Sequence, residues 1–438
     1  MFERDIIIGF LFSILLLLHI SWIVLFFYPS RRHQKNLKKT KNTQQPKISV
    51  IIPAHNEAYI IEKTIKHVLL SDYNSEIEVI VVDDGSTDNT SEIVTKISKR
   101  NKNVKLLQTP HCGKASAINK GMKFAKNDIL IVLDADSIVE KDCFKKLVNK
   151  FEDEKVAAVS GIIRAIKNNN PLTWFQDFEY MLSSTWRFLL SKIDSAYILP
   201  GLAAFRKKAL EDVNYFSADT FAEDFDIGLK LRKKGYKIEM SNATIYTRVP
   251  ETITGLIKQR LRWGRGTIDV IEKHRDILFN LRYKGVGIYG IPTQIFWFIH
   301  GLLYIPIAIN DIFGGYVRYY LLNNTILSLD VIRYFIAWFS VYGMIEYTYR
   351  TLTGVYQITL IFYLTLFLFI LYQIFNFLVL YRFREIKLEY LFVIFFYFPY
   401  CLFTLSLHTI PLIFKIFESL GFEVKIISGK TNVWSKSL

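Results

Sequence analysis

The stretch that decides the fold is I-L-I-V-L-D-A-D, residues 129–136. Its unbroken apolar run is typical of a strand that is buried on both faces. Two carboxylates, Asp134 and Asp136, follow the run at once, and unpaired carboxylates are too costly to bury. The sequence therefore predicts a buried strand that ends at a polar edge.

Similar short apolar runs alternate with helical patterns on both sides of this stretch. Alternating strands and helices predict an α/β fold with a parallel sheet covered by helices on both faces. Ligands of such sheets bind beyond the carboxyl ends of the strands, where the polar pairs Asn56-Glu57 and Asp83-Asp84 also fall. The predicted strands are Ile48–Ile52, Glu78–Val82, Val104–Leu107 and Ile129–Leu133, and the predicted helices are Glu57–Leu70, Asn89–Lys99, Lys114–Ala125 and Lys141–Phe151.

The composition of the 438 residues requires two different environments. Hydrophobic residues make up 51%, more than an ordinary soluble domain needs, yet 22% of the residues are charged. Both values fit a chain in which water-facing and lipid-facing segments are separate. The net charge of +15 suits anionic lipid or a phosphorylated substrate, and no nucleic-acid partner is expected. The three cysteines are too far apart to predict a metal or disulfide framework.

The first lipid-facing segment is Ile6 to Tyr28, which contains no charged residue and is long enough to cross a bilayer. The basic cluster Arg31–Lys41 follows it, so the positive-inside rule places the next segment in the cytoplasm. A cleaved signal peptide is the alternative, although its basic residues would come before the apolar run.

Apolar segments return after Lys284. Val286–Asn310, Thr351–Leu380 and Leu391–Phe414 are candidate membrane helices, whereas charges interrupt Asp330–Arg350. Four crossings would leave the C-terminus in the cytoplasm, and three would leave it outside. The expected organisation is a membrane helix at 1–28, a basic linker at 29–45, a catalytic domain at 46–284 with an interfacial helix near 252–275, a membrane region at 285–414 and a basic tail at 415–438.

Three motifs in the predicted α/β domain can bind a nucleotide. The carboxylates of Asp83-Asp84 can accept hydrogen bonds from a uracil or a ribose, although they could merely cap a helix. Lys114 opens a helix whose N-terminus suits an anion, although it could be an ordinary surface lysine. Asp134 and Asp136 can share Mg²⁺ or Mn²⁺ with a substrate phosphate.

Two further motifs come later in the chain. Glu223-Asp224 opens a helix, and Gln259, Arg262 and Trp263 share one helix face. An arginine can grip a diphosphate and an indole can support a sugar ring. A basic amphipathic helix on the membrane surface would show the same pattern.

Taken in order, these motifs resemble the inverting family 2 glycosyltransferases, in particular the processive membrane synthases of cellulose, chitin and hyaluronan and, most of all, those of poly-N-acetylglucosamine. The resemblance implies a GT-A type domain, with Glu57, Asp83, Asp84, Lys114, Asp134 and Asp136 binding the donor and Asp134 and Asp136 holding the metal. It implies that Asp224 is the general base and that Glu223, Gln259, Arg262 and Trp263 bind the diphosphate and the acceptor. The family's usual Thr-Glu-Asp is Ala222-Glu223-Asp224 here, and Trp434 resembles a tryptophan found in the tails of several synthases.

The expected activity is transfer of a sugar, N-acetylglucosamine first among the candidates, from a UDP-sugar to a growing β-linked polysaccharide. The enzyme would sit in the cell membrane as a multi-pass protein with a cytoplasmic catalytic domain. A transferase that adds one sugar to a lipid is the first alternative. A membrane protein that binds nucleotide without catalysis is the second.

Overall fold

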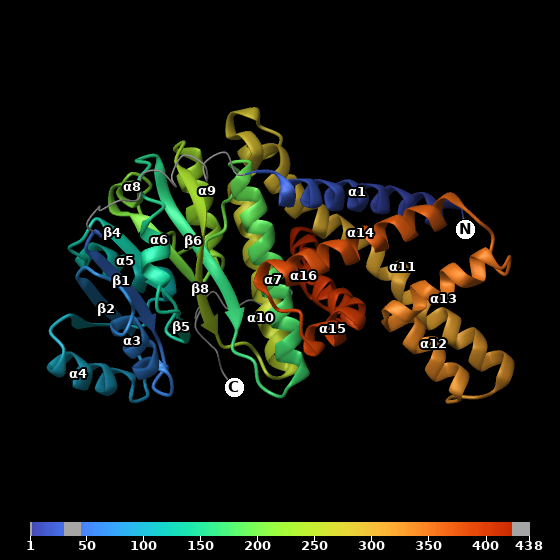
Figure 1. Ribbon diagram of the computed structural model, residues 1–438, viewed down its shortest axis with the longest axis horizontal. Coiled ribbons are helices and arrows are strands. Elements are labelled where there is room, and N and C mark those ends of the chain that lie inside the picture. The colour runs from blue at the N-terminus through green and yellow to red at the C-terminus, as the bar shows by residue number, and fades with distance from the viewer. Residues whose placement is uncertain (1, 30–44, 423–438) are drawn as a thin grey trace.

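The computed structural model describes residues 2–29 and 45–422. The basic cluster Arg31–Lys41 and Trp434 lie outside the described residues. Figure 1 shows an α/β domain at one end, a group of helices at the other, and two long helices, α7 and α10, between them.

The α/β domain is built on one sheet of eight strands in the order β3-β2-β1-β4-β7-β6-β8-β5. Strands β1 to β4 are mutually parallel, and β7 runs antiparallel to both β4 and β6. The strands are β1 (Ile48–Ala54), β2 (Ile77–Asp84), β3 (Val104–Thr109), β4 (Ile129–Leu133), β5 (Ser137–Val139), β6 (Val156–Ala165), β7 (Leu202–Arg206) and β8 (Lys237–Thr247). The four predicted strands are confirmed in position, whereas the sequence analysis did not identify the other four.

Helices cover both faces of the sheet because successive residues of a buried strand point to opposite sides. Val50 and Ile52 face a core shared with α3, α4 and α6, and Ile51 faces a core shared with α5, α8 and α9. These helices are α3 (Ile61–Leu69), α4 (Thr90–Arg100), α5 (Lys114–Phe124), α6 (Cys143–Val148), α8 (Lys207–Glu211) and α9 (Glu223–Lys233). Helix α3 begins later than Glu57, because Asn56 has a positive φ of 55° and the chain turns before the helix.

Helices α7 (Pro171–Lys192) and α10 (Ile253–Lys273) join the domain to the remaining helices. Phe178 and Met181 of α7 and Leu256 of α10 share one apolar core with residues of α1 (Phe2–Phe27), α14 (Leu360–Phe383), α15 (Leu388–Phe395) and α16 (Tyr397–Ser419). The α/β domain and the apolar helices are therefore packed together.

Four of the described helices are long and apolar enough to cross a membrane: Glu3–Phe27, Val286–Asn323, Leu360–Phe383 and Tyr397–Ser419. The second comprises a π-helical turn at Val286–Gly290 and α11 (Ile291–Asn323). The interrupted stretch Asp330–Arg350 is divided between α12 (Leu329–Phe339) and α13 (Val341–Leu352). Each is roughly 17 Å long, too short for a bilayer core of about 30 Å.

Helix α16 contacts α7 near its start and α10 near its end. Near its start the Tyr400 hydroxyl donates to Glu179 of α7, and near its end Lys415 lies 3.0 Å from Asp269 of α10. Among the described residues, three candidate membrane helices follow the α/β domain, α16 included, and the number of them that cross stays a prediction. Helix α16 also packs against α10 (Figure 1).

Candidate active site

The first part of the site lies at the carboxyl end of β2. Asp83 accepts a hydrogen bond from the Ser86 amide at 3.0 Å and another from the Ser91 hydroxyl. The buried Asp84 accepts from the amides of Cys112 at 2.9 Å and Gly113 at 2.8 Å. Asp84 therefore holds the loop that leads into α5.

Lys114, at the start of α5, connects the acidic groups of the site. Its ammonium lies 2.6 Å from Asp134, in the turn after β4, and 3.4 Å from Glu223, at the start of α9. Burial alone would lower the pKa of Lys114, but the charges of Asp134 and Glu223 raise it above its usual value. Lys114 therefore stays positively charged at the point where the turn after β4 meets the start of α9.

Asp224 is the second residue of α9 and is half-buried. Burial and the neighbouring Glu223 raise the pKa of Asp224 to about 6, and only part of that rise is offset by Lys114. A carboxylate with a pKa close to the working pH is a better proton acceptor than an ordinary aspartate. The geometry therefore suits Asp224 to general-base chemistry.

Asp134 and Asp136 supply the oxygen ligands that a hard divalent cation prefers. Asp136 is buried and accepts from the Thr247 hydroxyl at 3.1 Å, while the side chain of Asp134 is 28% exposed. Within residues 2–29 and 45–422, no group of three or more His, Cys, Asp or Glu residues could hold a metal ion. The pair fits a metal whose remaining ligands come from a substrate.

Helix α10 lies close to the loop that leads into α9. A Cβ atom added to Gly266 would lie 2.9 Å from both the Cβ and the amide nitrogen of Ala222, directly before Glu223. The lack of a side chain at Gly266 thus lets α10 pack against the loop that carries Asp224. The alanine that replaces the family's usual threonine forms part of this contact.

The three motif residues of α10 line the same cavity as Asp224. Gln259 has a buried side-chain oxygen without a hydrogen-bond partner among the described residues. The Trp263 ring is stacked near Tyr180 of α7, with 6.4 Å between the ring centroids. Arg262 completes the set, so a guanidinium, an amide and an indole all face one space.

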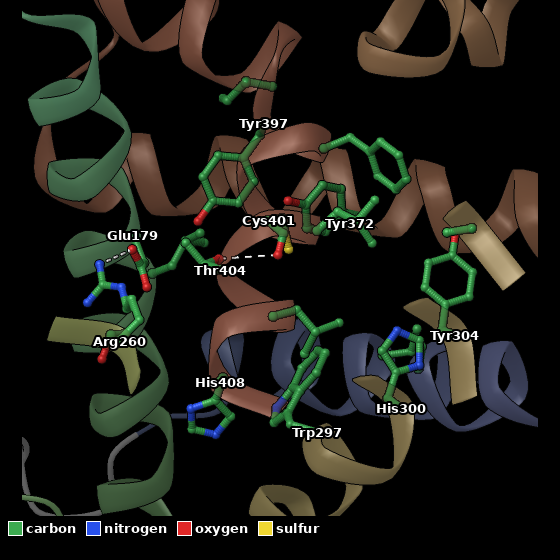
Figure 2. A pocket seen from close by; sticks show the side chains of 18 of the residues that line it. Glu179, Arg260, Trp297, His300, Tyr304, Tyr372, Tyr397, Cys401, Thr404 and His408 are labelled. Atoms are coloured by element: carbon green, nitrogen blue, oxygen red, sulfur yellow. Dashed lines mark hydrogen bonds and ion pairs between the residues drawn. The ribbon is translucent and has the colours of Figure 1, made fainter. Parts of the chain in front are cut away.

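That space is a cavity of about 1720 Å³ that continues from the α/β domain between the long apolar helices. At one end it is lined by the predicted site residues Glu57, Lys114, Asp134, Asp136, Glu223, Asp224, Gln259, Arg262 and Trp263. Asp83 and Asp84 do not line it. At the other end Figure 2 shows Trp297, His300 and Tyr304 of α11 opposite Tyr372 of α14 and Tyr397 of α16.

Comparisons with known proteins agree with this arrangement. Residues 49–213 match the model of Glycosyl transferase family 2. The chain is 33% identical over 304 residues to the poly-beta-1,6-N-acetyl-D-glucosamine synthase of Staphylococcus aureus (strain COL), covering 65% of this chain and 72% of that protein. This chain belongs to the family 2 glycosyltransferases. The glycosyltransferase is also 29% identical over 360 residues to the synthase of the same name from Staphylococcus epidermidis, covering 76% of this chain and 85% of that protein.

A solved structure shares the fold of this glycosyltransferase. The mannosyltransferase PcManGT from Pyrobaculum calidifontis, in complex with GDP-Man and Mn²⁺, superposes with a TM-score of 0.54 at 22% identity. The match covers 84% of this chain and 99% of that chain, so the likeness includes elements outside the α/β domain.

Several cavity residues escaped the sequence analysis. Glu179, Tyr180 and Arg187 come from α7, and Arg260 lies within the motif on α10. Burial lowers the pKa of Arg187 to about 10, which the charge of Asp224 only partly offsets. One pattern could have drawn attention to α7, because charged residues interrupt an otherwise apolar helical stretch. Nothing in the sequence, however, indicates that this helix borders the site.

Proposed function

We propose that this glycosyltransferase transfers N-acetylglucosamine from UDP-N-acetylglucosamine to a growing β-linked polysaccharide and passes the product through the cavity. The names of the Staphylococcus relatives support the choice of sugar and polymer. The observation that carries the proposal is the continuous cavity between Asp224 and the membrane helices α11, α14 and α16.

In the proposed reaction Asp224 removes the proton from an acceptor hydroxyl while that oxygen attacks the anomeric carbon of the donor. Lys114 and Arg262 supply positive charge for the departing diphosphate, and Asp83 at the end of β2 contributes to uridine recognition. Because the displacement occurs once, an α-linked donor gives a β-linked product.

Asp134 and Asp136 would hold a divalent cation, Mg²⁺ or Mn²⁺, together with the diphosphate. When bound, the cation supplies charge that stabilises the leaving group. The position of both carboxylates at the cavity wall supports this assignment, because a hard divalent cation prefers oxygen ligands. Lys114 already compensates part of the negative charge of Asp134 before a ligand arrives.

On the acceptor side, Trp263 would support the terminal sugar and Gln259 would bind one of its hydroxyl groups. The unpaired buried oxygen of Gln259 supports this role, because such an atom is costly unless a ligand satisfies it. Beyond Trp263, aromatic rings on α11, α14 and α16 offer faces along which sugar rings can move.

We place the α/β domain in the cytoplasm of a multi-pass membrane protein, with α1, α11 and α14 as crossing helices. Two ion pairs support the choice of these crossing helices. At the side far from the α/β domain, Arg4 near the start of α1 lies 3.1 Å from Asp311 of α11. At the side of the domain, Glu385 after α14 lies 3.0 Å from Arg164 of β6. Cysteine labelling from outside intact cells should reach a residue introduced at Asn324 and miss one at Asp128. The reverse pattern would reject this orientation.

The principal experiment separates a polymerase from a single-addition enzyme that uses a lipid acceptor. Detergent-purified enzyme is incubated with radiolabelled UDP-sugars, one at a time, in Mg²⁺ or Mn²⁺, and the products are sized. A ladder from UDP-N-acetylglucosamine supports the proposal, one added sugar supports the lipid transferase, and no turnover of any UDP-sugar supports a nucleotide-binding protein without catalysis.

A bulky substitution tests whether the product uses the cavity. Thr404 of α16 lines the cavity, whereas its neighbour Phe403 does not and is partly exposed on the outer surface. Thr404→Trp should shorten the products while UDP release in the first turnovers continues. Phe403→Trp, the matched control, should give products of normal length, and equal lengths in both variants would reject the cavity as the path.

A further inference from the structure

Arg260 lies between the motif residues Gln259 and Arg262 but is only 3% exposed. Its Nη2 donates to Glu179 Oε2 at 2.6 Å and lies 3.4 Å from the hydroxyl of Tyr400. The Tyr400 hydroxyl donates to the same carboxylate oxygen. One buried cluster therefore connects α7, α10 and α16, and Figure 2 shows its Glu179–Arg260 pair at the cavity wall.

The same guanidinium contacts the indole of Trp263. The Arg260 Cζ atom lies 4.3 Å from the centroid of the ring, one helical turn further along α10. Nε and Nη1 of Arg260 have no hydrogen-bond partner among the described residues. The short distance between the guanidinium and the ring centroid is that of a cation–π pair.

This arrangement constrains an otherwise adjustable side chain. A buried planar guanidinium whose Nη2 is held by a carboxylate and a hydroxyl has few ways to turn its flat face. The Tyr180 ring packs near the same indole. Trp263 is therefore held by two neighbours, and one of them is fixed by contacts to two other helices.

We propose that Arg260 is a positioning residue for sugar transfer: held by Glu179 and Tyr400, it orients the Trp263 indole and so sets the position of the acceptor sugar relative to Asp224. The inference rests on the proposed function in one respect, namely that Trp263 contacts the acceptor. A tilted indole would weaken acceptor binding and misplace the attacking hydroxyl, whereas donor binding would not change.

The test compares Arg260→Lys with Arg265→Met. The lysine retains the charge beside Glu179 but loses the planar group that contacts the indole. Arg265 also connects α10 to α16, through Glu418 at 2.9 Å, but it does not line the cavity. Arg260→Lys should raise the acceptor KM roughly tenfold with less change in kcat, leave the UDP affinity within about twofold and shorten the products. Arg265→Met should leave all four values near those of the wild type.

A double-mutant cycle shows whether Arg260 acts through Trp263. In a Trp263→Leu background, Arg260→Lys should cause no further rise in acceptor KM, because the ring it orients is absent. Additive effects, or an equal loss in Arg265→Met, would overturn the proposal and leave Arg260 as a purely structural link between helices.

The wild-type control keeps the two hypotheses apart. If the wild type adds a single sugar to a lipid, the proposed polymerase activity fails, yet the cycle can still be measured on the KM for that lipid. If the wild type makes polymer and the cycle is additive, only the role of Arg260 fails.

Discussion

The two ends of the cavity differ in chemistry and in how the chain builds them. At the donor end, Lys114, Asp134 and Glu223 form ion pairs at the edge of a buried sheet. At the membrane end, rings such as Trp297 and Tyr304 come from separate apolar helices. One end can hold a charged group in place, and the other offers flat surfaces without a fixed binding position.

The proposed function accounts for this difference, because the two ends would bind different groups. A diphosphate carries charge that needs oriented partners in a region of low dielectric. A neutral sugar polymer must leave after each addition, so stacking surfaces without strongly directional contacts are suitable. Substitutions at the donor end should therefore affect chemistry or UDP binding, and substitutions at the membrane end should affect product length.

The largest expected effect belongs to Asp224. Asp224→Asn should lower transfer by roughly two to four orders of magnitude, the usual contribution of a general base, and leave UDP affinity nearly unchanged. The thermal midpoint should not fall, because the fold disfavours the charged carboxylate. Asp219→Asn, an exposed substitution shortly before α9, is the control in both assays. Near wild-type transfer by a folded Asp224→Asn enzyme would remove Asp224 from the mechanism.

Metal-dependent UDP binding tests the donor end of the cavity directly. Asp134→Asn and Asp136→Asn should each weaken UDP binding in Mn²⁺ by roughly tenfold or more, equivalent to about 1.4 kcal/mol, as measured by calorimetry. Asp128→Asn, at the opposite end of β4, should have no effect. Unchanged UDP affinity in both site variants would contradict the metal assignment.

The contact between α10 and the loop that leads into α9 should be sensitive to one methyl group. In Gly266→Ala the new Cβ would meet Ala222 at 2.9 Å and push α10 away from Asp224. Transfer should fall roughly a hundredfold, the usual cost of a misplacement of about 1 Å, while UDP affinity persists. Gly9→Ala in α1, where a Cβ would have no neighbour within 4 Å, should be silent. A Gly266→Ala enzyme with normal transfer activity would show that transfer does not depend on close packing of α10 against the loop that carries Asp224.

The smallest effect concerns pH. Only the ionised form of Asp224 can accept a proton, and its pKa is raised to about 6. Transfer should therefore be constant above this value and fall about tenfold per unit below it. Lys114 should contribute no loss at higher pH, because its pKa is raised as well. An acid limb near pH 4 would mean that Asp224 has an ordinary pKa in the working enzyme.

The local patterns predicted much of the donor end. The run Ile129–Leu133 is apolar throughout because the strand is buried on both faces. The sequence therefore predicted both the position of this strand and the carboxylates that follow it. Strands β6 and β7 were not found because alanine, frequent in both, gives a weak strand signal. Helix α7 was not assigned to the site, because the partner of its Glu179, Arg260, lies 81 positions further along the chain.

The sequence by itself determined the order of motifs, the separation of polar and apolar segments, and the residues that carry charge at the ends of strands, because each depends on neighbours along the chain. Only the tertiary structure decided that α16 returns to α10, that Arg260 joins Glu179 and Tyr400, and that one cavity extends from Asp224 to α11. Those features depend on packing between distant segments, and local propensity and hydrophobic pattern do not encode which helix a given apolar face will meet.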